Sequence, residues 1–449
     1  MSPRRFDRRR FLATSAAAAT AAVVGPYVHT SRAAGSLAVG FWDHWVPGAN
    51  DTLTKLCKEW AAKEKVDIKI DYITSQGNKI LLTIAQEAQA KGGHDILSLP
   101  IWYCPGQAAN LEPVDDLVQP LIAKYGKPGV AVEYLGKQDG HWVAVPATAG
   151  SQVKGPCGRI DLFKQHAGLD LTKMYPPGAP PDKTLTDKWT WETFLDAAQK
   201  CHKAGFPFGI GMGQTADSTD SAGAIFAAYG AHLVDAKGEI TVNSDATRQA
   251  LDYAKRLVQF LPADVFAWDD ASNNKWLISG KGALIMNPPS AWAVAKRDNP
   301  KLAEQLWTFP APKGPKGRFQ PVLPFYWGIW KFSKNKAAAR SLLTYLSQRD
   351  AVEQLVVASG GYDVPAFVGL RNLKIWDEVG PPKGTLSHYP PGEDEIESVP
   401  GSPAPAAIAT QMYSQATITK MIAKVTQGNE SPDKVIAWAA SELEGFTRA

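Results

Sequence analysis

Residues 37–99 of this chain, which open with the apolar run LAVGF at 37–41, decide its fold. Two further strand-like runs follow: VDIKIDY at 66–72 alternates apolar with polar residues, and DILSL at 95–99 is mostly apolar. Between the runs, apolar side chains recur at helical spacing in two segments, at 53–61 and 80–88. The order strand, helix, strand, helix, strand predicts parallel strands, because each helix must cross back over the sheet.

The remainder of the chain continues to mix helices and strands. Apolar periodicity predicts a helix over residues 191–204, and Ser431-Pro432 opens a last helix. Residues 208–212 predict a short strand. A chain of 449 residues is too long for one hydrophobic core, so we expect an α/β protein of at least two lobes.

Residues 1–33 have the features of an export signal. The basic run RRRFL at 8–12 is followed by an Ala-rich stretch at 13–24, and small residues precede a cleavage site expected after Ala33. Two arginines before Phe-Leu and a weakly apolar stretch resemble a twin-arginine signal, although Asp7 replaces the usual Ser or Thr. The alternative is an ordinary secretory signal. Both alternatives predict export to the periplasm, and the twin-arginine pathway fits the motif better.

The charge of the chain is concentrated in that first segment. It contains six arginines and one aspartate, which leaves 42 basic and 43 acidic side chains of the total 48 and 44. The body after residue 33 therefore has no basic excess, which argues against nucleic acid or anionic lipid as a partner.

The four cysteines do not define a metal or redox site. None of them has Cys-x-x-Cys spacing, which argues against zinc and thioredoxin-type chemistry. An oxidising periplasm permits disulfides, and four cysteines allow three full pairings, so bridges and buried free thiols are both open. The residues concerned are Cys57, Cys104, Cys157 and Cys201.

Aromatic residues gather in the loops where a ligand is expected. In an open parallel sheet, ligands bind beyond the carboxyl ends of the strands. Aromatic faces pack on the C–H faces of sugar rings, while carboxylate, imidazole and hydroxyl groups satisfy ring hydroxyls. The loop after the first strand supplies Trp42, Asp43, His44 and Trp45, and the loop after residue 99 supplies Trp102 and Tyr103. Core packing is the alternative role for each ring. Later loops add four more candidates, namely Trp292, Tyr326, Trp327 and Tyr362.

Signals of an enzyme are weak. The chain has no Gly-x-Ser-x-Gly, His-Glu-x-x-His, Walker A or Gly-x-Gly-x-x-Gly motif, and its eight histidines lack metal-ligand spacing. Asp115-Asp116 fits the start of a helix better than acid/base work. We expect neither catalysis nor a cofactor nor a metal.

A series of motifs along the chain resembles the family 1 extracellular solute-binding proteins of ABC importers, which are similar in plan to maltodextrin-binding proteins. Each motif is short, but their order is that of the family over nearly the whole mature chain. They are HDI at 94–96, LEPV at 111–114, DGHWVAVP at 139–146, TWETF at 190–194, YGAHLVD at 229–235, SGKGA at 279–283, FPAP at 309–312 and SKNK at 333–336.

The resemblance implies a two-lobed periplasmic-binding-protein fold, with open sheets, flanking helices and a hinged cleft. It places residues 34–146 and 325–367 in an N-terminal lobe, and residues 147–324 and 368–449 in a C-terminal lobe. It also implies that a closed, monomeric receptor delivers a small solute to a membrane permease. The two early aromatic loops would face Trp292 across the cleft, with Tyr326, Trp327 and Tyr362 near the hinge.

The solute is expected to be a carbohydrate or polyol. A non-sugar polar solute is one alternative, although a strongly anionic one would call for an Arg that these loops lack. A secreted carbohydrate-active enzyme is another, and it would require a carboxylate pair across the cleft.

Overall fold

The computed structural model describes residues 35–448, and the predicted export signal at 1–33 lies outside that range. The predicted alternation at the start is confirmed. The elements are β1 (Ser36–Trp42), α2 (Ala49–Glu64), β2 (Asp67–Ile73), α3 (Lys79–Ala90) and β3 (Ile96–Pro100). β1 lies between β2 and β3 and pairs in parallel with both. The buried face of α2 consists of Ala49, Leu53, Leu56, Cys57, Trp60 and Ala61, which is the apolar stripe expected from the sequence.

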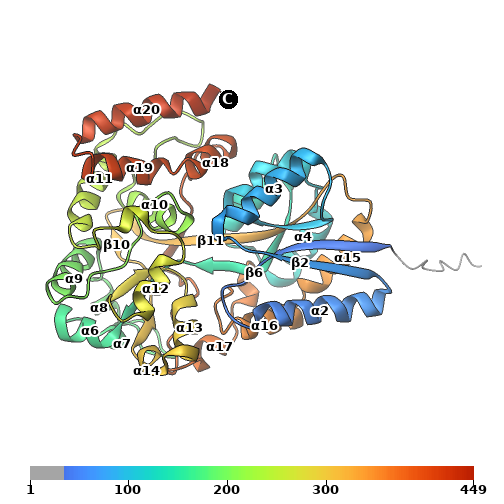
Figure 1. The fold of residues 1–449 in the computed structure, drawn as a ribbon, viewed down its shortest axis with the longest axis horizontal. Helices are drawn as coiled ribbons and strands as arrows, with labels where there is room; N and C mark the ends of the chain where they lie inside the picture. The colour runs from blue at the N-terminus through green and yellow to red at the C-terminus, as the bar shows by residue number, and fades with distance from the viewer. Residues whose placement is uncertain (1–34, 449) are drawn as a thin grey trace, which may run out of the picture.

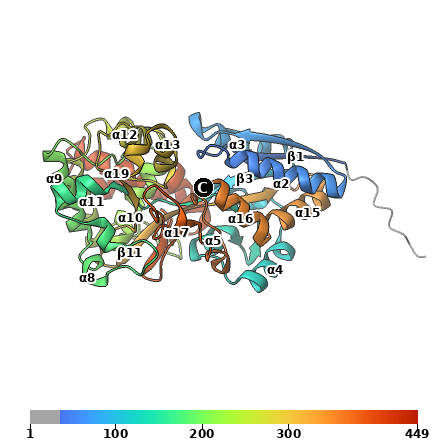
Figure 2. The same ribbon diagram turned by 90° about the horizontal axis from the view of Figure 1, so that it is seen from below.

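A first lobe forms around this sheet, and a second lobe forms around a smaller one. Figures 1 and 2 show the two lobes as separate masses of helices and strands. The remaining helices of the first lobe are α4 (Asp115–Tyr125), α5 (Val130–Gly136), α15 (Lys336–Leu346) and α16 (Arg349–Ala358).

The sheet of the second lobe has three antiparallel strands in the order β8-β7-β9, namely β7 (Pro156–Arg159), β8 (Leu284–Met286) and β9 (Leu306–Thr308). The strand predicted at 208–212 does not form. Within this segment, Gly209 alone makes an isolated β-bridge, with Ile285. The helices of the second lobe include α9 (Trp191–Lys203), α10 (Ala216–Tyr229), α11 (Asp245–Val258), α12 (Ser272–Ile278) and α13 (Ser290–Asp298).

Two long strands connect the lobes. β6 (Val145–Val153) and β11 (Gly317–Ile329) run antiparallel to each other, and β11 also pairs with β3 in the first lobe. Their register shifts between Leu323 and Phe325. Figure 1 shows both strands running between the two lobes. A third connection lies beside them, because the N–H of Val364 donates to the carbonyl oxygen of Ser151.

The C-terminal part of the chain returns across both lobes. It contains α17 (Ile375–Glu378), β12 (Glu395–Ser398), α18 (Ala406–Ser414), α19 (Thr417–Thr426) and α20 (Pro432–Arg448). Ahead of α18, the carbonyl oxygen of Pro400 accepts the indole N–H of Trp102, and that of Ala404 accepts the hydroxyl of Tyr134. The segment 400–404 therefore covers part of the first lobe. By the division expected from the sequence, this segment belongs to the second lobe.

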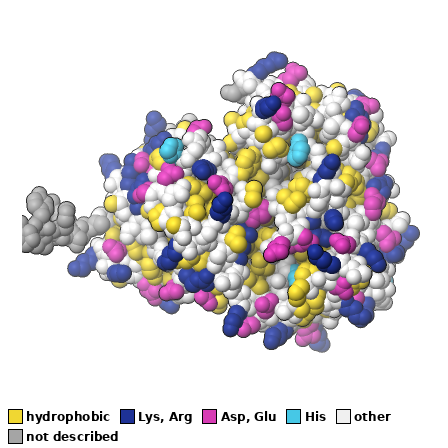
Figure 3. Space-filling model, turned by 180° about the vertical axis from the view of Figure 1, so that it is seen from behind, with side chains coloured by type: hydrophobic (Ala, Val, Ile, Leu, Met, Phe, Trp, Pro, Cys, Tyr) yellow, Lys and Arg dark blue, Asp and Glu magenta, His cyan; other side chains and the backbone are white. Residues whose placement is uncertain are grey.

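Within the described range, no helix has both the length and the apolar character that a bilayer crossing requires. The four cysteines, Cys57, Cys104, Cys157 and Cys201, are buried free thiols. On the face seen in Figure 3, acidic and basic side chains are interspersed, as the nearly balanced charge of the chain after residue 33 predicts.

Candidate ligand site between the lobes

A cavity of about 180 Å³ lies between the two lobes. The first lobe contributes the loops at the carboxyl ends of β1, β2 and β3, the edge at which ligands of parallel sheets bind. The second lobe contributes the first turn of α10, the α12 region, the start of α13 and the end of α18. The crossing strands β6 and β11 form its floor through Gln152, Lys154, Leu323 and Phe325.

The first-lobe side of the cavity is aromatic. Four predicted site residues line it: Trp42, Trp45, Tyr103 and Tyr362. Phe325, which the sequence reasoning missed, packs on Trp42 with ring centroids 5.1 Å apart. Trp42 and Tyr362 lie nearly parallel at 6.4 Å. Trp45 differs from Trp42 because its ring is only partly buried, and it can therefore offer a face to a solute.

Gly150 on β6 allows these rings to close on the crossing strands. Its φ of +94° lies in the left-handed region, and a Cβ there would meet the Phe325 ring at 2.9 Å and the Trp42 ring at 3.1 Å. A glycine is thus required at this point by both the backbone and the space.

Asp43 and His44 do not line the cavity. The carboxylate of Asp43 is exposed and accepts the side-chain amide of Asn50. The Nδ1 atom of His44 accepts the N–H of Val46, so Nε2 carries the proton and donates to Asp363 at 3.0 Å. Asp363 also accepts the N–H of Gly150. The imidazole therefore links the loop after β1 to Asp363, which in turn is hydrogen-bonded to Gly150 on β6.

The other four predicted aromatics are also outside the cavity lining, because each is buried in packing that the sequence does not reveal. At most 2% of each is exposed. Trp102 bonds to Pro400 and packs edge-on against Tyr134. Trp292 donates its N–H to the carbonyl oxygen of Pro381. Tyr326 bonds to the carbonyl of Val132, and Trp327 packs on Phe41.

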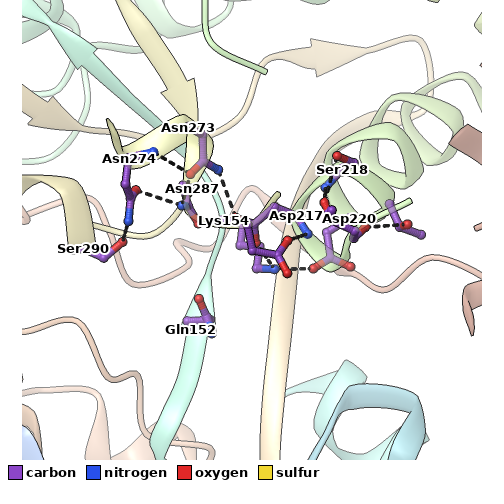
Figure 4. Close-up of polar contacts among 12 residues, drawn as sticks. Gln152, Lys154, Asp217, Ser218, Asp220, Asn273, Asn274, Asn287 and Ser290 are labelled. Atoms are coloured by element: carbon purple, nitrogen blue, oxygen red, sulfur yellow. Dashed lines mark hydrogen bonds and ion pairs between the residues drawn. The ribbon is translucent and has the colours of Figure 1, made fainter. Parts of the chain in front are cut away.

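The second-lobe side of the cavity is polar and contains a buried ion cluster (Figure 4). The ammonium of Lys154 donates to Asp217 at 2.7 Å and to Asp220 at 2.6 Å, and its side chain is 2% exposed. Asp217 and Asp220 lie on the first turns of α10, whose N-terminus is capped by the hydroxyl of Thr215. Burial would lower the pKa of Lys154, but the charges of the two aspartates outweigh it and raise that pKa.

A third carboxylate, Asp270, lines the cavity beside this cluster. It accepts the N–H of Asp217 at 3.1 Å. Burial, and next the charge of Asp217, raise the pKa of Asp270 to about 6, against the smaller opposing effect of Lys154. The carboxyl group of Asp270 is therefore mostly ionised only above about pH 6.

Amide side chains complete the polar wall. Asn287 donates to the side-chain oxygens of both Asn273 and Asn274 at 3.0 Å, and Asn274 donates to the hydroxyl of Ser290 at 2.9 Å (Figure 4). Asn273 in turn donates to Asp217, which joins the amides to the ion cluster. Hydrogen bonding among these groups fixes their directions before a solute arrives.

The cost of ionising Asp270 gives a measurable prediction. Because its pKa is raised on folding, the native protein binds this proton more tightly than the unfolded chain, and stability falls as pH rises from about 4 to about 6. Asp270→Asn keeps an oxygen that can accept the N–H of Asp217 but carries no charge. We expect this variant to be more stable than the wild type by about 1–3 kcal/mol at pH 7, and nearly equal at pH 4. Urea denaturation at both pH values measures the difference, and an equal or lower stability at pH 7 contradicts the prediction.

This polar wall was not predicted from the sequence. Gln152, Lys154, Asp217, Asp270 and the asparagines lie up to 135 residues apart, in segments without a recognisable motif. The one signal was the helix start at Thr215, where Asp217 stands in the first turn, and such an aspartate is ordinarily read as a capping charge.

Two lobes of α/β structure, joined by three connections and enclosing a polar and aromatic cavity, define the periplasmic-binding-protein fold. The model of the bacterial extracellular solute-binding protein family matches residues 47–353, and the chain belongs to this family.

Solved structures show the same fold at low identity. T. maritima MalE3 with maltose bound has 17% identity and a TM-score of 0.70, covering 92% of this chain and 99% of that one. An ABC transporter solute-binding protein from Thermotoga lettingae TMO, bound with alpha-D-tagatose, has 18% identity and a TM-score of 0.70 with the same coverages. A "Probable ABC transporter-binding protein" of Deinococcus radiodurans is 28% identical over 187 residues, which span 40% of this chain and 43% of that protein.

Proposed function

We propose that the protein captures a carbohydrate or polyol in the periplasm and delivers it to the permease of an ABC importer. The observation that carries the proposal is the composition of the interlobe cavity. Aromatic side chains from the first lobe line one side of it, and amide, hydroxyl and carboxylate groups from the second lobe line the other. This pairing suits a solute with apolar C–H faces and many hydroxyls. The maltose and tagatose bound to proteins of the same fold add support.

The site that we propose differs from the set expected from the sequence. It keeps Trp42, Trp45, Tyr103 and Tyr362, and it adds Gln152 and the second-lobe wall. Trp42 and Tyr362 are packed into the hinge region, so their contribution is to shape the cavity. Trp45 and Tyr103 are the partly exposed rings, and we assign the stacking role to them.

In this proposal the receptor is a monomer that binds its solute and does not catalyse a reaction. The acidic side chains at the cavity belong to one cluster around Lys154 on the second-lobe side, and among residues 35–448 the first-lobe lining supplies no carboxylate. Glycoside hydrolysis needs two carboxyl groups on either side of the scissile bond. We also propose that the protein is exported by the twin-arginine pathway. The chain is proposed to cross between the two lobes near residues 146/147, 324/325 and 367/368. The register shift of β11 between Leu323 and Phe325 supports the second of these boundaries.

A thermal-shift screen of sugars and polyols tests the proposal. A solute that binds only the native protein raises Tm with its concentration, and we expect at least one sugar or polyol to do so. The solute recovered from an overnight incubation should be chemically unchanged. Products in that sample would establish the enzyme alternative, and a library without a single hit would refute carbohydrate capture.

Trp45→Ala is expected to weaken the binding of any hit by about 10- to 30-fold, because a stacking indole contributes roughly 2 kcal/mol at a binding site. Its effect on Tm without solute should be small, since the ring is only partly buried. Trp438→Ala is the matched control, because this partly buried indole lies on α20, outside the cavity lining. Isothermal titration calorimetry measures both, and equal affinities for the two variants would remove Trp45 from the site.

A further inference from the structure

The charges around the cavity do not balance. Three carboxylates, Asp217, Asp220 and Asp270, surround a single ammonium group, that of Lys154. Lys154 is the one basic residue in the cavity lining among residues 35–448. With all four groups ionised, this wall therefore has two negative charges in excess. An unbalanced buried charge is costly unless a partner neutralises it, so the wall is unfavourable to an anion and favourable to a cation.

Two polar atoms at this wall have no hydrogen-bond partner within the described range. One is the hydroxyl oxygen of Tyr413, a cavity-lining residue that is 7% exposed, and the other is the Oδ1 atom of Asp220, which is fully buried. The two groups are neighbours, but no hydrogen bond of acceptable geometry joins them. Native proteins rarely leave buried polar atoms unpaired, and the Tyr413 hydroxyl is the donor that adjoins Asp220, so these two groups can satisfy each other without a ligand. The excess negative charge of the wall is therefore what favours a cationic solute.

The opposite side of the cavity also suits a cation. Trp45 and Tyr103 line the cavity from the first lobe, and aromatic rings attract ammonium groups through the negative potential above their faces. A solute between the lobes would thus meet a carboxylate wall on one side and aromatic faces on the other.

We propose that the natural solute carries a protonated amine beside its hydroxyl groups, and that Asp270 receives this amine; the solute is then an amino sugar. Asp270 is the candidate because it lines the cavity and is not in the hydrogen-bonded pair of carboxylates that holds Lys154. Its charge is stabilised by neither an ammonium contact nor full exposure, and an incoming amine supplies the missing counter-charge. The asparagine network and Gln152 take the hydroxyls. The inference rests on the proposed carbohydrate-binding function and specifies its substrate class.

Matched pairs of probes test the amine separately from the sugar. Isothermal titration calorimetry at pH 7 compares D-glucosamine with D-glucose, and the disaccharide of D-glucosamine with cellobiose. The amine-bearing member of at least one pair should bind about 10- to 100-fold more tightly, as expected of a buried charge-assisted hydrogen bond. Putrescine, an amine without hydroxyls, distinguishes an amino-sugar site from a site for alkyl amines, and it should bind more weakly than the amino sugar.

Asp270→Asn should reduce the amine preference, which is the ratio of the affinities for the amine-bearing and the neutral sugar, to within about threefold. Asp269→Asn is the matched control, because the neighbouring carboxylate is exposed and caps the local turn through Ser272 and Ala271, a role that asparagine can also perform. This control should keep the full preference.

The outcomes separate the two claims. Neutral sugars that bind as tightly as their amine partners overturn the inference and leave carbohydrate capture standing. Putrescine binding more tightly than every amino sugar overturns the amino-sugar class. If none of these sugars binds while another sugar or polyol of the thermal-shift library does, the amino-sugar class is overturned. If no sugar or polyol of the library binds at all, the proposed function itself fails.

Discussion

Lys154→Met is expected to lower the free energy of unfolding by about 3–5 kcal/mol, because it leaves Asp217 and Asp220 in a buried position without their counter-charge. The cost arises mainly from the stranded carboxylates and not from the lost lysine. A second substitution that removes one of them, Lys154→Met with Asp220→Leu, should therefore recover part of the loss. Urea denaturation followed by circular dichroism measures each value.

A surface pair provides the control for this result. Lys69 lies 3.0 Å from Asp71, with its side chain 75% exposed, and Lys69→Met should change the stability by less than about 1 kcal/mol. A loss below about 1 kcal/mol in Lys154→Met, or no recovery in the double variant, would show that the cluster is not a compensated buried network.

Trp102→Ala is expected to lower the free energy of unfolding by about 3–5 kcal/mol, without removing a ligand contact. The ring is 1% exposed, and its N–H donates to the carbonyl oxygen of Pro400 at 2.7 Å. Removing it leaves both a cavity and an unsatisfied carbonyl between the first lobe and the segment 400–404. The affinity for a solute, measured at a temperature at which the variant is folded, should stay within about threefold of the wild type.

Trp102→Phe separates packing from hydrogen bonding at this position. It keeps most of the ring volume and loses the N–H, so a smaller cost of about 1–2 kcal/mol is expected. If Trp102→Ala instead lost more than tenfold in affinity while keeping its stability, Trp102 would be a stacking surface, as the sequence suggested.

The contrast between Trp45 and Trp102 shows how far the sequence could be taken. Both follow strands of the parallel sheet, so the sequence correctly placed both loops at the carboxyl ends of β1 and β3. Which ring remains at the cavity depends on the segment 400–404, almost 300 residues further along the chain, which covers Trp102. No local pattern carries that information. The β-α-β-α-β order was predictable because hydrophobic period is a local property.

The polar wall was not predictable for a related reason. Lys154, Asp217 and Asp270 become neighbours only when β6, α10 and the segment before α12 come together. Their function depends on the distances between them and on their burial. The sequence identifies each residue type but contains neither the distances nor the burial. The resemblance to solute-binding proteins supplied the two-lobed plan, but it could not supply the composition of the cavity between the lobes.

A crystal structure with the strongest solute from the screen tests the central claim most directly. We predict that the solute lies between the lobes, with a ring face against Trp45 or Tyr103 and polar groups against Asp270 and the Asn274–Asn287 network. A solute bound anywhere outside this cavity, or an empty cavity in crystals grown at saturating solute, would contradict the account.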